Sequence, residues 1–166
     1  MLIYHGSNMA VEIPELREPN RALDFGGGFY ATTNLEQAKR FAKIVHKRHG
    51  YEGTPTVSIY EFDENGIPHE FNILRFDSAN EDWFDFVCDH RRDTYAGKWC
   101  DIAIGAVAND RVYATIGLYE SEFLSKEQAI ASFKVNPLFD QVVFKTEAAL
   151  SLLTFRNTYD PREREE

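Results

Sequence analysis

The stretch Gly26-Gly27-Gly28-Phe29-Tyr30 joins bare backbone to an aromatic ring. Consecutive glycines carry no side chains, so a flat ligand can approach the main chain closely. Tyr30 follows within a short expected strand, residues 29–32. This pattern is typical of a pocket for a stacked, planar heterocycle. An ordinary turn before a core strand fits it equally well, because a glycine run alone is weak evidence.

Other polar residues lie on or beside expected strands that can converge with Tyr30. His5-Gly6-Ser7 ends the first strand, and Gln141 begins a strand near the C-terminus. An imidazole, a phenol and a primary amide supply hydrogen bonds and stacking. Each residue also has a purely structural interpretation: a satisfied histidine, a core tyrosine, a strand start. The turn Asn109-Asp110 is a weaker candidate for polar help.

Several common chemistries lack their signatures. None of the five histidines falls in an H-E-x-x-H or Cys/His pattern, so no zinc site is expected. The sequence contains no G-x-x-x-x-G-K-[ST] and no G-x-S-x-G, and Gly26-x-Gly28 has no third glycine at Ala31. Cys88 and Cys100 show no metal spacing. Reduced structural thiols and a cytoplasmic location are therefore expected.

Charge is distributed unevenly along the chain. The formal net charge is −9, and residues 51–130 alone carry six basic and sixteen acidic side chains. A negative body repels phosphates, so broad nucleic-acid groove binding is disfavoured. Residues 1–50 carry seven basic and five acidic side chains, which permits a small anionic ligand there. No apolar run approaches a membrane span, and no secretion leader is visible.

Hydrophobic periodicity predicts an α+β fold with a largely antiparallel sheet and peripheral helices. The 166 residues are expected to form one domain over 1–156, followed by a charged, flexible tail over 157–166. Residues 8–25 are expected to form a loop that covers or borders a site. Expected strands are 2–5, 29–32, 56–62, 70–76, 101–108, 111–118 and 141–145. Expected helices are 34–48, one after Asn80, one from Ser125 to about 134, and 146–153, the first capped by Thr33 with Glu36.

The order of three segments resembles the ADP-ribosyltransferases. The segments are Tyr4-His5-Gly6-Ser7, then Gly28-Phe29-Tyr30-Ala31-Thr32 running into a helix, then Gln141-Val142-Val143-Phe144. The resemblance is to the His-Tyr-Glu branch, which includes diphtheria toxin and the poly(ADP-ribose) polymerases. The chain is also similar, over roughly residues 1–155, to a bacterial family of small ADP-ribosyltransferase-like domains. Shared blocks include Asp24-Phe25-Gly26 and Asp101-Ile102.

This resemblance implies a split, mostly antiparallel sheet and an enzyme that transfers ADP-ribose from NAD to a macromolecular acceptor, protein or nucleic acid. NAD is the implied co-substrate, without a metal. The implied catalytic residues are His5 on a ribose hydroxyl, Tyr30 stacked on nicotinamide, and Gln141. The implied NAD-binding residues are His5, Gly6, Ser7, Gly28, Phe29, Tyr30 and Thr32. Small bacterial domains of this kind often resemble toxins, which implies a small neutralising antitoxin.

Gln141 departs from the family pattern, which usually has Glu at this strand start. An amide can bond the ribose 2-hydroxyl but brings no negative charge to a developing cation. Losing a charge-assisted bond costs roughly 1.5–3 kcal/mol, about ten- to a hundredfold in rate. Single slow transfer is therefore favoured over chain elongation. A silent NAD- or ADP-ribose-binding module and an NAD glycohydrolase remain as alternatives.

Overall fold

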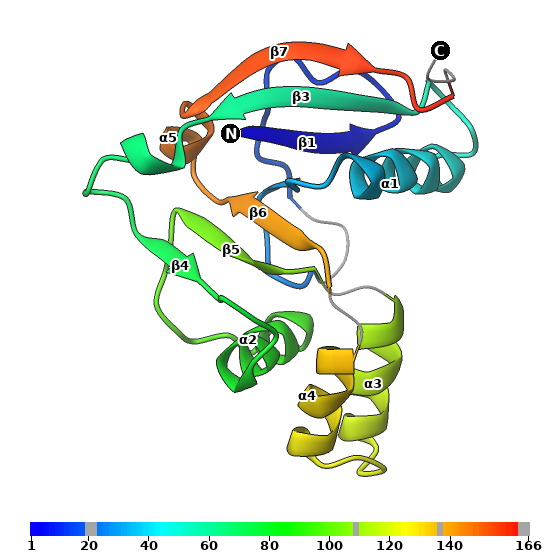
Figure 1. Ribbon diagram of the computed structural model, residues 1–166, viewed down its shortest axis with the longest axis vertical. Coiled ribbons are helices and arrows are strands. Elements are labelled where there is room, and N and C mark those ends of the chain that lie inside the picture. Colours follow the sequence, from blue (N-terminus) through cyan, green and yellow to red (C-terminus); the bar gives the residue numbers. More distant parts are fainter. Residues whose placement is uncertain (19–22, 108–109, 136–137, 163–166) are drawn as a thin grey trace.

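Two β-sheets form the centre of the computed structural model, which describes residues 1–18, 23–107, 110–135 and 138–162 (Figure 1). One sheet has the order β1-β3-β7, and the other has the order β2-β6-β5-β4. The strands of the first are β1 (Leu2–Ser7), β3 (Thr56–Phe62) and β7 (Leu153–Tyr159). The strands of the second are β2 (Phe29–Ala31), β6 (Asp140–Phe144), β5 (Ile102–Ala106) and β4 (Ile73–Arg75).

Strand pairing in the described residues is antiparallel except between β4 and β5, which are parallel. With helices outside the sheets, this confirms the expected α+β class. Period-two alternation correctly placed β3, which is the central strand of its sheet. The sequence is therefore sufficient to predict the fold class and the strand with strong alternation of apolar and polar residues.

The two sheets meet where β1 lies beside the residue after β2. Tyr4 and Thr32 form an isolated bridge, with their N–H groups 2.8 and 3.0 Å from each other's carbonyl oxygens. Away from the bridge, apolar side chains of both sheets pack together, as in the edge-to-face pair of Phe62 and Phe144 at 5.2 Å. The bridge fixes the middle of β1 relative to the end of β2.

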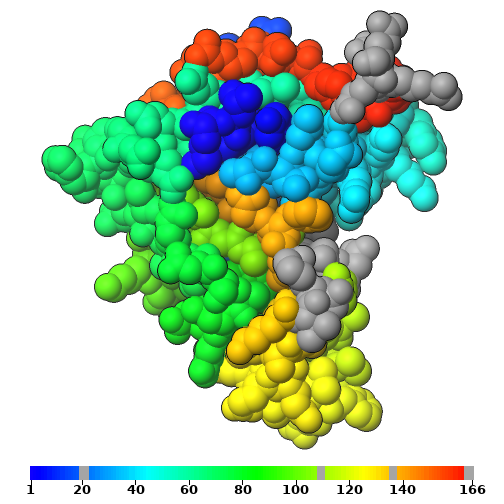
Figure 2. Space-filling view, in the orientation of Figure 1, coloured from blue at the N-terminus to red at the C-terminus, as the bar shows by residue number. Residues whose placement is uncertain are grey.

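Helices cover the sheets at opposite ends of the molecule. Helix α1 (Leu35–Arg48) packs on β1 and β3 through Ala38 and Ala42, whereas α2 (Glu81–Arg91), α3 (Asp110–Glu120) and α4 (Lys126–Val135) gather near β5 and β6 (Figure 1). Figure 2 shows the same division from one face, with α4 in yellow far from β1 in blue. The short elements are α5 (Glu147–Leu150) and a 3-10 turn (Glu64–Gly66). No helix among the described ranges has the length and apolar character needed to cross a membrane.

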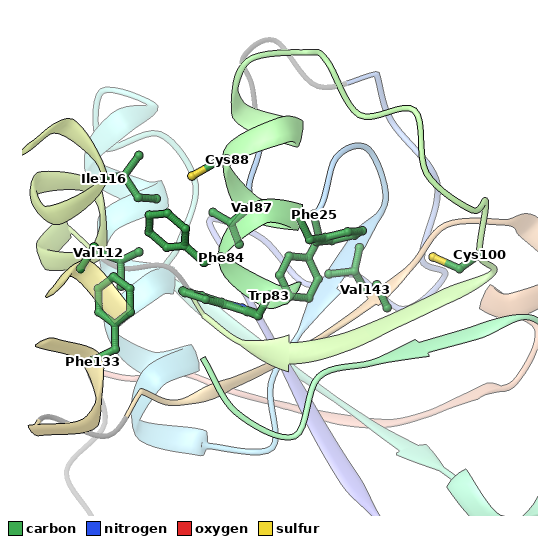
Figure 3. Close-up of a cluster of buried hydrophobic side chains, with 13 residues drawn as sticks. Phe25, Trp83, Phe84, Val87, Cys88, Cys100, Val112, Ile116, Phe133 and Val143 are labelled. Carbon is green, nitrogen blue, oxygen red and sulfur yellow. The ribbon is translucent and has the colours of Figure 1, made fainter. Parts of the chain in front are cut away.

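The helical end is held by an aromatic core drawn in Figure 3. Phe25, Trp83 and Phe84 are fully buried, and Phe133 of α4 packs edge-on against the Trp83 ring at 5.6 Å. Phe25 connects the glycine-rich segment to this core, because its ring lies 5.1 Å from that of Phe86. Burial on this scale anchors the residues that flank Phe25.

Both cysteines are free and buried, as expected for structural thiols. Burial raises the pKa of the Cys88 thiol to about 11 and also raises the pKa of Cys100. Both thiols are therefore protonated at neutral pH and poorly reactive.

Helix caps are partly as expected. Asn80 caps α2 and accepts from the Trp83 N–H at 2.9 Å, and Ser125 forms a reciprocal box with Gln128 before α4. The cap of α1, however, is Asn34, whose side chain accepts from Gln37 N–H at 2.8 Å, and not Thr33. The Thr33 hydroxyl instead bonds the Asp140 carboxylate at 2.8 Å.

Three expected elements are wrong. Residues 111–118, expected as a strand, belong to α3, because buried Val112, Thr115 and Ile116 follow the spacing of one helix face. The strand expected over 70–76 is only Ile73–Arg75. The helix expected over 146–153 ends at Leu150, and β7 then takes in residues 157–159, which the sequence predicts to be part of a flexible tail.

Candidate functional site

A cavity of ≈ 560 Å³ opens between α1, β1, β2 and the start of β6. It brings together His5, Tyr30 and Gln141, which come from three distant parts of the chain. The other implied site residues that line it are Ser7, Gly28 and Phe29. Its volume is in the usual range for small-molecule and cofactor sites. His5, Tyr30 and Gln141 thus line one ligand-sized cavity.

His5 is held in a defined orientation by β2. Its Nδ1 lies 2.7 Å from the Tyr30 carbonyl oxygen, and its ring stacks on Phe29 with centroids 4.4 Å apart. A carbonyl only accepts, so Nδ1 carries the proton and Nε2 of the neutral ring is an acceptor. Burial lowers the pKa of His5, with a smaller contribution from the positive charge of Arg17. The cavity therefore contains a neutral imidazole near pH 7.

Tyr30 is fixed at both its backbone and its hydroxyl. The hydroxyl donates to the Gly26 carbonyl at 2.6 Å and accepts from the Phe25 N–H at 3.2 Å. These bonds tie the tip of the ring back to the glycine-rich turn, in which Gly26 has φ +74°. The phenol ring is thus a fixed wall of the cavity, suited to stacking.

Gln141 is buried on β6, opposite Gly105 of β5. Its amide nitrogen lies 3.4 Å from the Ala106 carbonyl oxygen, which also accepts from the Trp83 indole at 2.9 Å. A carbonyl requires a donor, so the amide nitrogen faces Ala106 and Oε1 is the group left for a ligand. A glutamate at this position cannot make the bond to Ala106 when it is ionised.

Two implied NAD-binding residues lie beside the cavity and do not line it. Gly6 packs against α1, where an added Cβ would lie 2.3 Å from the Ala38 carbonyl oxygen. Tyr4 directs its N–H and C=O groups at Thr32. The direction of these groups alternates along a strand, so the N–H and C=O of Gly6 point to the same side of β1 as those of Tyr4. Thr32 is buried, and its hydroxyl lies 3.2 Å from the Asp140 carboxylate.

Gly28 and Phe29 shape the cavity through packing. Gly28 has φ +152°, and an added Cβ would lie 2.6 Å from a Val143 methyl group and 2.8 Å from the Phe144 carbonyl oxygen. Phe29 is buried between the His5 ring and Tyr60. The close packing of Gly28 against β6 thus requires a glycine at this position, independently of any ligand.

The loop after β1 borders the cavity, as expected, through residues that include Val11, Arg17 and Leu23. Two hydrogen bonds anchor it to β3: the Val11 N–H donates to the Ser58 hydroxyl at 2.9 Å, and the Tyr60 hydroxyl donates to the Val11 carbonyl. Burial raises the pKa of Tyr60 to about 12, so that donor keeps its proton. The loop is therefore held against β3 at Val11, where it borders the cavity.

Asp24 and Tyr113 also line the cavity, although the sequence analysis predicts neither as a site residue. Asp24 is only 7% exposed, and one of its carboxylate oxygens accepts from the Tyr113 hydroxyl at 2.6 Å. Asp24 directly precedes Phe25, and this adjacency was visible in the sequence. Tyr113 lies within residues 111–118, which the sequence predicts as a strand. A strand lacks the helical spacing that places Tyr113 at the cavity.

The Asn109-Asp110 turn, the other cavity and the possibility of a metal site remain to be described. Asn109 lies outside the described residues, and α3 begins at Asp110. A larger cavity of ≈ 860 Å³ lies between the end of β5, α4 and the start of α2, and its lining includes Ala106 and Asp140 but no implied site residue. Within the described ranges, no group of three or more His, Cys, Asp or Glu side chains is placed to hold a metal ion.

Comparisons with known proteins locate the chain only at the level of a family. Neither the curated proteins nor the solved structures contain a significant match. A family model described as a protein of unknown function, DUF3990, matches residues 1–155, and this covers every residue of the cavity described above. The chain belongs to the DUF3990 family.

Proposed function

We propose that this protein is an NAD-dependent mono-ADP-ribosyltransferase acting on a macromolecular target. The observation that carries the proposal is the convergence of His5, Tyr30 and Gln141 on one ligand-sized cavity. Their order along the chain is the order that resembles the ADP-ribosyltransferases. A small antitoxin partner belongs to the proposal through that resemblance alone, and a cytoplasmic location belongs to it through the two free cysteines.

The chemistry needs positioning more than a reactive protein group. Cleavage of the bond between nicotinamide and ribose passes through an oxocarbenium-like state, which hydrogen bonds to the neighbouring 2-hydroxyl stabilise. A fixed ring such as Tyr30 orients nicotinamide, and the Nε2 of neutral His5 accepts a bond from a ribose hydroxyl. The Gln141 Oε1 is placed to accept a second. Such preorganised groups lower the barrier without a metal.

The amide of Gln141 favours a second candidate, a module that binds NAD or ADP-ribose without turnover. The bond from Gln141 to Ala106 suits a neutral side chain, and an amide adds no charge at the reacting centre. The two candidates differ only in whether the glycosidic bond breaks. Binding and turnover must therefore be measured on the same protein.

The test uses NAD labelled in the adenosine part, incubated with the protein and a cell extract. The proposal predicts nicotinamide release and label on a macromolecule, both lost in Tyr30→Ala and kept in Phe123→Ala, an exposed aromatic outside the cavity. Free ADP-ribose without labelled macromolecule identifies a glycohydrolase. Calorimetric NAD binding without nicotinamide release identifies the silent module. A protein that shows no NAD binding and no nicotinamide release refutes both the transferase and the binding module.

A further inference from the structure

We propose that Asp24 is the catalytic carboxylate of this cavity, a role that rests on the proposed ADP-ribosyl transfer. The His-Tyr-Glu enzymes of the proposed resemblance usually have Glu where this chain has Gln141, so the amide leaves the reaction without a negative charge at that position. The structure offers a carboxylate from a different element. Asp24 precedes β2, lines the same cavity as Tyr30 and Gln141, and is 7% exposed.

The hydrogen bond on Asp24 has the length of a charge-assisted contact. The Tyr113 hydroxyl lies 2.6 Å from one carboxylate oxygen, within the range for O–H donors to ionised acceptors. Tyr113 itself is positioned by the Arg91 guanidinium, which lies 3.9 Å above its ring. Aspartate is rarely buried, so a carboxylate that is only 7% exposed and lines a cavity needs an explanation beyond packing.

The backbone around Asp24 is fixed to the residue proposed to hold nicotinamide. The Phe25 N–H, which belongs to the peptide bond after Asp24, donates to the Tyr30 hydroxyl at 3.2 Å. The Phe25 carbonyl accepts from the Lys145 ammonium, and the Phe25 side chain is fully buried. Asp24 is therefore held in register with Tyr30 before any ligand binds, as electrostatic preorganisation requires.

The reaction assigns a definite part to this carboxylate. The bond between ribose C1′ and nicotinamide N1 breaks, and its electron pair leaves with nicotinamide. The positive charge left on the ribose is stabilised by the negative charge of Asp24. The acceptor's O–H or N–H group then attacks C1′, and its proton passes to Asp24 and from there to water. Gln141 and His5 keep the hydrogen bonds to the ribose hydroxyls.

The test compares single-turnover nicotinamide release and NAD binding in three variants, and a fourth, Asp24→Ala, is used for chemical rescue. Asp24→Asn keeps the size of the side chain and an oxygen that accepts from Tyr113, but removes the charge. Tyr113→Phe keeps the charge and removes the donor. Glu12→Gln makes the same charge change at an exposed position of the loop after β1, outside the cavity.

We expect Asp24→Asn to slow release about ten- to a hundredfold while the dissociation constant for NAD changes less than about threefold. Tyr113→Phe is expected to slow it by a smaller factor, and Glu12→Gln not at all. Added formate is expected to restore release in Asp24→Ala, which a merely structural role does not explain.

Release by Asp24→Asn within about twofold of the wild-type rate, at unchanged NAD affinity, overturns this inference and leaves the transferase proposal standing. If Asp24→Asn does not fold, the decision passes to Tyr113→Phe, in which an unchanged rate overturns it. A wild-type protein that neither binds nor cleaves NAD overturns the transferase proposal, and the role of Asp24 with it.

Discussion

The imidazole of His5 and the main chain of Tyr30 are joined directly, with Nδ1 of one 2.7 Å from the carbonyl oxygen of the other. This contact connects β1 of one sheet to β2 of the other, one residue along from the Tyr4–Thr32 bridge on the β1 side. It fixes which ring nitrogen carries the proton, and so the direction from which a ligand can donate to His5. The two residues therefore function as one rigid corner of the cavity.

The pKa of His5 predicts a loss of stability in mild acid. Burial lowers that pKa in the folded state, so between it and the ordinary value of 6.5 the unfolded chain binds more protons. The free energy of unfolding should therefore fall as pH drops below about 6.5. Urea unfolding at several pH values between 5 and 7.5 measures this dependence. His5→Asn keeps a donor for Tyr30 but cannot titrate, so its stability should depend less on pH.

His90 supplies the matched control for that measurement. Burial also lowers its pKa, and its Nδ1 contacts the Phe86 carbonyl, but it does not line the cavity. His90→Asn should remove its own share of the pH dependence without changing ligand binding. A pH profile of His5→Asn identical to that of the wild type would contradict the assignment of a neutral, buried ring to His5.

Removing only the hydroxyl of Tyr30 should separate stability from stacking. Tyr30→Phe leaves the ring but deprives the Gly26 carbonyl and the Phe25 N–H of their partner. The expected loss in the free energy of unfolding is about 1–3 kcal/mol, with most of the NAD affinity retained. Denaturant titration and calorimetry measure the two quantities. Equal loss of NAD affinity in Tyr30→Phe and Tyr30→Ala is inconsistent with a stacking role for the ring.

Giving Gln141 the carboxylate of the His-Tyr-Glu enzymes in the proposed resemblance should not improve this protein. In Gln141→Glu the bond to the Ala106 carbonyl is lost, and an ionised carboxylate is buried next to that oxygen. The expected cost is about 1–3 kcal/mol at neutral pH, and it should be smaller at pH 4, where the new side chain is protonated. Thermal unfolding at the two pH values tests this. Gln141→Glu that is as stable as wild type at pH 7 and releases nicotinamide faster would refute both this expectation and the role given to Asp24.

Close contact between β1 and α1 should make Gly6 intolerant of any side chain. An added Cβ would lie 2.3 Å from the Ala38 carbonyl oxygen and 2.7 Å from the Ala42 nitrogen, both backbone atoms that cannot yield easily. Gly6→Ala should cost about 1–3 kcal/mol in unfolding free energy. A Cβ added at Gly117 of α3 has no atom within 4 Å. Gly117→Ala should therefore stabilise the protein by up to about 1 kcal/mol. Similar stabilities for the two variants would contradict this packing.

The sequence predicted local features better than long-range ones. The alternation of 56–62 and the capping residues Asn80 and Ser125 gave correct elements, because each signal lies within a few residues. Residues 111–118 misled, since β-branched and aromatic side chains favour strands locally, whereas tertiary packing buries Val112 and Ile116 on one helix face. The sequence contains the carboxylate of Asp24, but its hydrogen bond with Tyr113 depends on the formation of α3.

A structure of the protein with bound NAD decides whether this cavity is the NAD site. We expect the nicotinamide ring to stack on Tyr30, a ribose hydroxyl to donate to the Nε2 of His5, and the ribose to lie within reach of Asp24 and Gln141. NAD bound in the larger cavity between α4 and the end of β5, or no bound NAD at millimolar concentration, would contradict this expectation.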